Sequence, residues 1–161
     1  MRTLSVSKQN NKHIPVQILA QDGEGVSVMA GLVQDALFPI SDTQYNKTEK
    51  TFVIVINRFC HESIRKTPPF IRRHSILHFS NVLSVSSLNV KKINSTTYVD
   101  RIYALLSVIY VLDRGKDYIY LTLAGGSTIR LEVNGIHFML KDVGEAWQTM
   151  SKPCHENDGL V

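Results

Sequence analysis

YIYLTLAGGSTIRLEVNGIHFMLKD, residues 118–142, alternates apolar and polar side chains through short runs that are separated by two glycine-containing turns. The apolar residues of the first two runs all have odd numbers: Ile119, Leu121, Leu123, Ile129, Leu131 and Val133. Because successive strand residues point to opposite faces of a sheet, a hairpin here must pair odd residues with odd residues. A two-residue loop at Gly125-Gly126 would instead pair odd-numbered residues with even-numbered ones. The pattern therefore predicts a three-residue loop, Ala124-Gly125-Gly126, with Gly126 in the left-handed conformation of a bulge.

The second turn, Asn134-Gly135, is the preferred pair for a two-residue hairpin loop. The register expected around it pairs Val133 with Ile136, Leu131 with Phe138 and Ile129 with Leu140. All of these pairs are apolar, so the parity of the first hairpin is preserved. Residues 118–142 are therefore predicted to form a three-stranded antiparallel meander, and Trp147 is expected to fold back over its end.

Strand periodicity also dominates the chain upstream of this segment. Residues 43–47 and 51–59 are predicted to form a hairpin around residues 48–50. The run 51–59 is apolar on both faces, as is typical of a central strand, and 102–112 shows the same property. Two more strands are predicted, over residues 72–79 and 82–90. The basic loop 60–71 contains Pro68-Pro69, which cannot sit inside a strand ladder.

One amphipathic helix is predicted near the N-terminus. It follows a short strand over residues 13–21, and Asp22 can cap its first turn. Over residues 24–37 the apolar residues fall on a single helical stripe: Val26, Met29, Ala30, Val33 and Leu37. Two glycines weaken this helix, so it is expected to depend on packing against the sheet. Pro39 is expected to end it.

These patterns predict an α+β domain with about eight strands and one helix. The twisted antiparallel β-sheet is expected to be either a partly closed β-roll, for example one that is pleckstrin-homology-like, or an open sheet packed on the helix. The chain has 161 residues, of which 43% are hydrophobic and 20% charged, so it can bury one core. We predict a single domain over residues 13–148 between flexible tails at 1–12 and 149–161.

The formal net charge of +4 is unevenly distributed. In the stretch 58–101, eight lysines and arginines stand against only two acids, Glu62 and Asp100. A basic surface of this kind can attract phosphate groups, so nucleic-acid binding by the 58–101 face is one functional alternative.

The expected compartment is the cytoplasm. The sequence contains two cysteines, Cys60 and Cys154, which are too few to indicate the disulfide framework of a secreted protein. Residues 1–12 lack the apolar run of a signal peptide, and no apolar run approaches the ~20 residues needed to span a bilayer. Association with a membrane is therefore not expected.

The residues do not predict a metal, a cofactor or a catalytic group. Cys60-His61 and Cys154-His155 could nominally supply zinc ligands, but neighbouring strand residues point in opposite directions. His74 and His78 would lie ~13 Å apart on a strand, too far to share an ion. Gly125-Gly126-Ser127 lacks the following helix of a phosphate-binding loop. A non-enzymatic role is favoured, and an enzyme acting on a small molecule remains the alternative if a deep pocket gathers ionisable groups.

A polar binding surface is nevertheless predicted. An acid at the predicted helix end, Asp35, opposes the helix dipole and needs a cationic partner, for which Arg58 or Arg73 is the natural candidate. Such a pair could simply lock the helix on the sheet, or it could form part of a recognition site. The residues predicted for this surface are Asp35, Asn57, Arg58, Arg72, Arg73 and His74. The expected partner is a protein, and the expected state is a monomer or a homodimer.

Several short segments also occur in a recognisable order. They are LVQDA (32–36), NRF (57–59), LHF (77–79), VLSV (82–85), LTLAGG (121–126) and IRLEV (129–133). In this order and spacing the chain resembles, over about residues 16–147, the domain of unknown function 2948 family of alphaproteobacterial proteins. That family has no assigned activity, so the resemblance implies a small bacterial cytoplasmic protein and no catalytic residue.

The chain departs from the family pattern at one point. In the family, Asn-Arg-Phe is followed by a variable residue, tryptophan and glutamate, whereas this chain has Cys60-His61-Glu62 there. The departure argues against a metal-binding or thiol role for Cys60 and His61.

Overall fold

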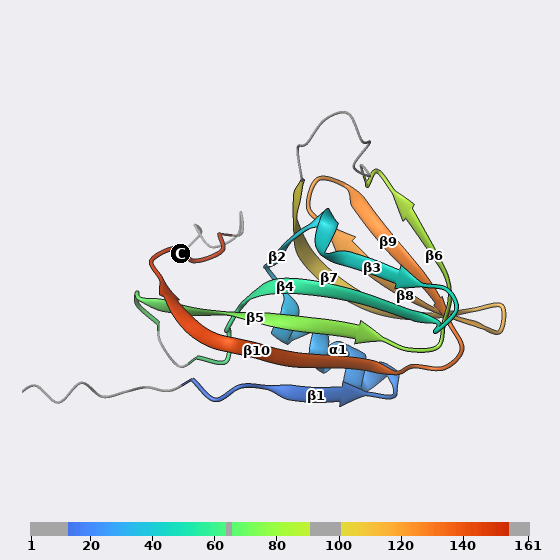
Figure 1. Ribbon diagram of the computed structural model, residues 1–161, viewed down its shortest axis with the longest axis horizontal. Helices are drawn as coiled ribbons and strands as arrows, with labels where there is room; N and C mark the ends of the chain where they lie inside the picture. Colours follow the sequence, from blue (N-terminus) through green and yellow to red (C-terminus); the bar gives the residue numbers. More distant parts are fainter. Residues whose placement is uncertain (1–12, 64–65, 91–100, 155–161) are drawn as a thin grey trace, which may run out of the picture.

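The computed structural model describes residues 13–63, 66–90 and 101–154 (Figure 1). The elements, in chain order, are β1 (Gln17–Ala20), α1 (Gly23–Val33), β2 (Ala36–Pro39), the 3-10 turn η1 (Ile40–Asp42), β3 (Thr43–Asn46), β4 (Thr51–Phe59), β5 (Phe70–Phe79), β6 (Val82–Leu88), β7 (Ile102–Asp113), β8 (Lys116–Leu123), β9 (Ser127–Val133) and β10 (Phe138–Thr149). The β-rich α+β class with one helix is thus confirmed. Of the tails predicted at 1–12 and 149–161, residues 1–12 and 155–161 lie outside the described residues, and Thr149 is the last residue of β10. No helix in the described part of the chain is long and apolar enough to cross a membrane.

All ten strands belong to one antiparallel sheet with the order β1-β10-β5-β4-β2-β7-β8-β9-β6, and β3 pairs with β4 beside this path. Among the strands of the described residues the path ends at β1 and β6, so the sheet that they form is open. In Figure 1 the strands β1, β10 and β5 lie below β4, and β7, β8, β9 and β6 rise above it. The helix α1 packs against β7, β1 and β4. Of the two predicted versions the open sheet is therefore found, and a pleckstrin-homology-like roll is not confirmed.

The first hairpin of the predicted meander has the expected register. Leu121 lies opposite Ile129, and Ile119 lies opposite Leu131. Pairing of Leu123 with Ser127 leaves a three-residue turn, in which Gly126 has a φ of +73°. A left-handed φ favours glycine because a Cβ atom would crowd the backbone there. Parity therefore predicted both the loop length and the position of its bulge.

The second predicted hairpin is wrong. The strand β10 does not pair with β9 but runs between β5 and β1, where Leu140 lies opposite Leu77 and Ile18. The other edge of β9 is occupied by β6, with Val85 opposite Leu131. Phe138 and Leu140 do face the core, as parity required. Alternation fixes the face of a strand but not its neighbour, and Trp147 accordingly lies within β10 instead of over the β8–β9 hairpin.

The predicted helix extends too far toward its C-terminus. It ends at Val33, and Asp35 takes a left-handed φ of 65° that redirects the chain into β2. There Leu37 pairs with Asn57 and Ala104 instead of continuing the helical stripe. A spacing of four residues fits both helix and strand periodicity, so the stripe could not distinguish them.

The beginning of the helix agrees with the sequence. Asp22 is its N-cap, and Oδ1 accepts a hydrogen bond from the backbone N–H of Gly25 at 2.7 Å. A Cβ atom at Gly25 would lie 3.0 Å from the Cβ of Ala20. Glycine therefore allows α1 to approach the end of β1 closely.

The core lies between α1 and one face of the sheet. Buried residues of the helix and of the strands belong to one hydrophobic cluster, which includes Val26, Met29 and Val33 of α1 and Phe52, Ile54, Ile56, Leu77, Phe79, Phe138 and Leu140 of β4, β5 and β10. The central position predicted for β4 is confirmed by partners on both of its edges. The opposite apolar faces are not covered, since Val55 is 36% and Ile109 is 50% exposed. A strand with apolar side chains on both of its faces is therefore not necessarily buried on both faces.

Candidate functional site

The inward row of the sheet changes from apolar to charged at one end of the core. On β4 the row Ile54 and Ile56 continues with Arg58, and on β10 Leu140 is followed by Asp142. On β5, between these strands, Arg73 is the register partner of Arg58 and Ser75 is the partner of Asp142. Because the three strands lie side by side, their charged inward positions form one cluster.

Arg58 is the centre of this cluster. Its side chain is fully buried, and its Nε and Nη2 donate to the two carboxylate oxygens of Asp142 at 3.0 and 2.7 Å. Nη1 and Nη2 also donate to Glu62, at 2.9 and 2.8 Å. Asp142 further accepts hydrogen bonds from Ser75 Oγ at 2.6 Å and from the backbone N–H of Val16 at 2.8 Å. The guanidinium is thus held by two carboxylates, and Val16 is tied to the same network.

These contacts keep the cluster ionised. Burial by itself would raise the pKa of Asp142, but hydrogen bonds from Arg58, Ser75 and Val16 hold it below its usual range. Burial would likewise raise the pKa of Glu62, but the hydrogen bonds it accepts and the positive charge of Arg58 together lower it. Burial would lower the pKa of Arg58, yet its two carboxylate partners raise it above the ordinary value. At neutral pH these groups therefore carry fixed charges.

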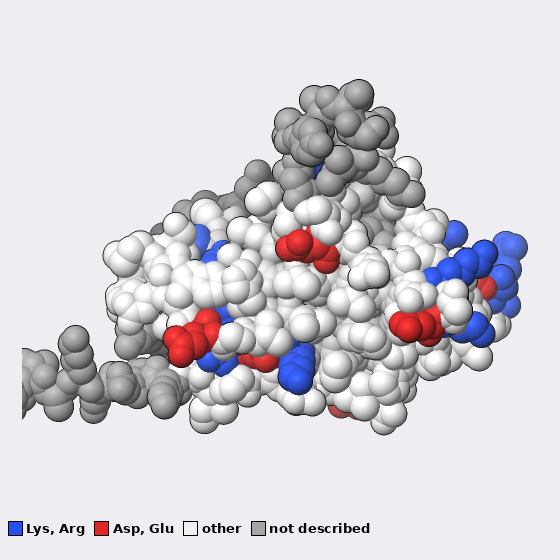
Figure 2. All heavy atoms as spheres, in the orientation of Figure 1, with Lys and Arg blue, Asp and Glu red and all other residues white. Residues whose placement is uncertain are grey.

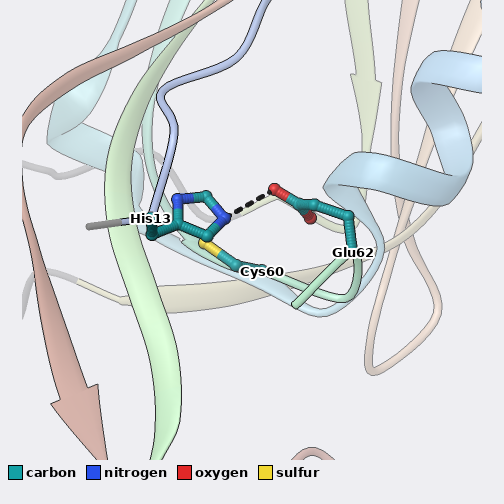
Figure 3. Close-up of side chains that lie close together, drawn as sticks. All are labelled: His13, Cys60 and Glu62. Carbon is teal, nitrogen blue, oxygen red and sulfur yellow. Dashed lines mark hydrogen bonds and ion pairs between the residues drawn. The ribbon is translucent and has the colours of Figure 1, made fainter. Parts of the chain in front are cut away.

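A thiol and an imidazole lie beside the network (Figure 3). The ligand atoms of His13, Cys60 and Glu62 all lie within 4.8 Å of one another, a spacing that could hold a metal ion. However, both oxygens of Glu62 already accept from Arg58, and His13 Nε2 lies 3.1 Å from Oε1. Burial raises the pKa of Cys60 to about 11, whereas a metal needs the thiolate. Glu62 and His13 are thus already paired, and Cys60 remains a thiol.

The outward side chains at the same end of the sheet form a second group. Arg72 Nη1 donates to Asn57 Oδ1 at 3.2 Å, and its guanidinium lies 5.4 Å from the centre of the Phe59 ring. Beside them, the rings of His74 and Trp147 are 4.7 Å apart. This face therefore combines aromatic surface with cationic groups.

Asp35 has a different partner from the one predicted. Its Oδ2 lies 3.4 Å from His61 Nε2, and the same nitrogen lies 2.9 Å from the carbonyl oxygen of Gln34. Arg58 is instead held by Asp142 and Glu62. The prediction was wrong because Asp142, which lies 84 residues away in the sequence, occupies the inward position next to Arg58.

The predicted surface is therefore divided between two faces. Arg58 and Arg73 are on the inward row, Asn57, Arg72 and His74 are on the outward face, and Asp35 lies where β2 begins. Successive strand residues alternate, so Arg72 and Arg73 could not share a face. Whether these residues bind a ligand stays a prediction.

Sequence reasoning missed the contributions of Asp142, Glu62 and His13. One signal was available for Asp142. It has an even number, like the inward-facing Phe138 and Leu140 of the same strand, and is therefore an acid in an inward position. A buried acid needs a partner, and this indicates an ion pair but not which arginine supplies it.

A groove of about 640 Å³ opens at this end of the sheet. It is lined by Phe59, Cys60, His61, Ser63, Lys66, Phe70, Ile71 and Lys152. Phe59 and Phe70 contact each other with ring centres 5.7 Å apart. The described lining contains two lysines and a histidine but no aspartate or glutamate. The groove thus combines an aromatic wall with positive charge.

Residues 16–155 match the model of the family described as "Protein of unknown function (DUF2948)". No curated protein and no solved structure matches the chain significantly. The matched range includes every strand and the helix described above. The chain belongs to the DUF2948 family.

Proposed function

We propose that this protein is a non-enzymatic binding module that holds an acidic segment of a partner protein in the groove at the end of β4 and β5. The observation that carries the proposal is the lining of that groove. Lys66 and Lys152 provide positive charge, while Phe59 and Phe70 provide apolar surface. Complementary charge selects and orients a partner, and aromatic side chains supply much of the contact energy.

The walls of the groove are held in place before any partner arrives. Arg72 lies over Phe59 and is itself fixed by Asn57. His61 contacts the Phe59 ring at 4.8 Å between ring centres and is paired with Asp35. Such preorganisation reduces the entropy lost on binding. The outward residues of the predicted surface therefore act as supports for the groove.

The chemistry of the cluster supports binding over catalysis. A pKa of about 11 keeps the Cys60 thiol protonated at neutral pH, so it is a poor nucleophile. The lowered pKa values of Glu62 and Asp142 leave both permanently ionised instead of poised for proton transfer. Two other grooves, of about 540 and 330 Å³, are lined mainly by apolar and hydroxyl side chains. Cys60 and Cys154 do not form a disulfide with each other, which is consistent with the proposed cytoplasmic location.

A charge-reversal experiment tests the proposal. We would measure the fluorescence anisotropy of a short labelled peptide with alternating glutamate and leucine. The double variant Lys66→Glu/Lys152→Glu is expected to weaken binding by about tenfold or more, since two attractive charges become repulsive. The matched control is Lys47→Glu/Lys141→Glu, which changes the net charge equally at exposed positions outside the groove. Equal weakening in both variants, or no binding by the wild type, would contradict the proposal.

Nucleic-acid binding is the second candidate, because Phe59 and Trp147 lie near Arg72 and could stack on bases. On the face shown in Figure 2, however, lysines and arginines lie in small separate groups and not in a continuous tract. Competition distinguishes the two candidates. A single-stranded oligonucleotide that displaces the acidic peptide and binds more tightly, with a steep salt dependence, would favour nucleic acid.

A further inference from the structure

Arg73 differs from Arg58 and Arg72 in the hydrogen bonding of its guanidinium. The residue is only 7% exposed, and its Nε and Nη1 are buried without a hydrogen-bond partner among the described residues. Arg58, by contrast, donates to two carboxylates, and Arg72 donates to Asn57. Buried donors without partners are unfavourable, because they lose hydrogen bonds to water and gain none in return. The fold therefore holds a cation that is ready to accept a further partner.

The two acids of the Arg58 cluster, Asp142 and Glu62, are already committed to other donors. Asp142 accepts from Arg58, Ser75 and Val16. Glu62 uses both of its oxygens to accept from Arg58. Neither carboxylate forms an ion pair with Arg73. A partner for its open donors must therefore come from outside this network.

Arg73 also lies beside the groove. Ile71, two residues away on β5, shares its face of the strand and lines the groove together with Cys60. Lys66 and Lys152 line the same groove, so its electrostatic field attracts anions. An anion that enters the groove thus approaches the side of the sheet on which Arg73 lies.

We propose that Arg73 anchors an anion subsite next to the groove, behind Ile71 on the inward side of β5, where it binds the oxygens of a carboxylate or a phosphate. A guanidinium presents its N–H donors in a rigid plane that matches two oxygens of either group. The location of this subsite rests on the proposed function, because a carboxylate of the bound acidic segment would occupy the anion position beside Arg73. Small anions nevertheless test it without the peptide.

The experiment is thermal unfolding of the full chain in inorganic phosphate, acetate or chloride at equal ionic strength. Phosphate or acetate is expected to raise the wild-type Tm by roughly 3–6 °C over chloride at about tenfold above its Kd. Arg73→Met should abolish this rise. Arg114→Met, which removes an exposed arginine in the turn between β7 and β8, should preserve it. Whichever of phosphate and acetate gives the larger rise identifies the preferred oxyanion.

Equal melting of the wild type in all three salts would overturn the subsite, as would an undiminished rise in Arg73→Met. If Arg73→Met does not fold, Arg73→Lys keeps the charge but removes the planar fork, and a rise equal to that of the wild type would then overturn it. The two proposals can fail separately. An Arg73-dependent rise without peptide binding contradicts only the acidic-segment function, and peptide binding without such a rise contradicts only the subsite.

Discussion

At the scale of single residues, three arginines close in sequence have three different environments. Arg58 is enclosed by two carboxylates, Arg72 lies over an aromatic ring, and Arg73 is buried with open donors. The three side chains carry the same charge. Their environments differ because they point to different faces of the sheet and because the neighbouring strands place different residues opposite each of them. The consequences should be visible in the stability of substituted proteins.

Asp142→Asn should destabilise the protein by about 3–5 kcal/mol, because breaking a buried ion pair leaves Arg58 partly uncompensated. Urea unfolding followed by circular dichroism would measure the change. Glu132→Gln is the control, since Glu132 is only partly buried and pairs with the exposed Lys116 at 2.9 Å. That substitution should leave the unfolding midpoint almost unchanged. Equal losses in the two variants would contradict the assigned importance of the buried network.

The same network predicts how stability depends on pH. The pKa values of Asp142 and Glu62 are lowered in the folded protein, so the unfolded chain binds protons more readily. Their contribution should be complete above the ordinary carboxyl pKa of about 4 and should be lost as the pH falls through the lower folded values. Melting temperatures measured from neutral to acidic pH should fall less steeply for Asp142→Asn than for the wild type. Parallel curves would show that Asp142 does not contribute.

At the scale of elements, two of the three glycines of α1, Gly25 and Gly31, have opposite roles. A Cβ atom at Gly25 would meet Ala20 Cβ and Cα at 3.0 and 3.1 Å, whereas one at Gly31 would meet nothing within 4 Å. Gly25→Ala should therefore destabilise the protein by about 1–3 kcal/mol through overpacking. Gly31→Ala should stabilise it by about 0.5–1 kcal/mol, because alanine favours the helix. Chemical denaturation of both variants checks the signs, and stabilisation by Gly25→Ala would refute the close approach of α1 to β1.

At the scale of the whole molecule, the open sheet should show graded stability. β8 is paired on both edges, by β7 and β9, whereas β6 ends the sheet and pairs only with β9 among the described strands. Hydrogen exchange followed by mass spectrometry should therefore be slower in peptides from β8 than in peptides from β6. Equal protection would indicate that the free edge of β6 is covered in solution.

The sequence by itself determined which side chains face inward, the register of the β8–β9 hairpin and the capped beginning of α1. Each of these depends on residues a few positions apart, so periodicity and turn chemistry are sufficient. For the site, the sequence indicated the charged residues of β4 and β5 but not how they are divided between faces and partners.

Only the tertiary structure decided that β10 joins β5 and β1, that residues 36–39 leave the helix to become β2, and that Asp142 reaches Arg58. These outcomes depend on which arrangement of all the strands buries the most apolar surface while pairing the buried charges. The alternation of side chains between the two faces of each strand is the same in all of these arrangements. The choice of neighbours, and with it the groove and the position of Arg73, is therefore a property of the whole fold.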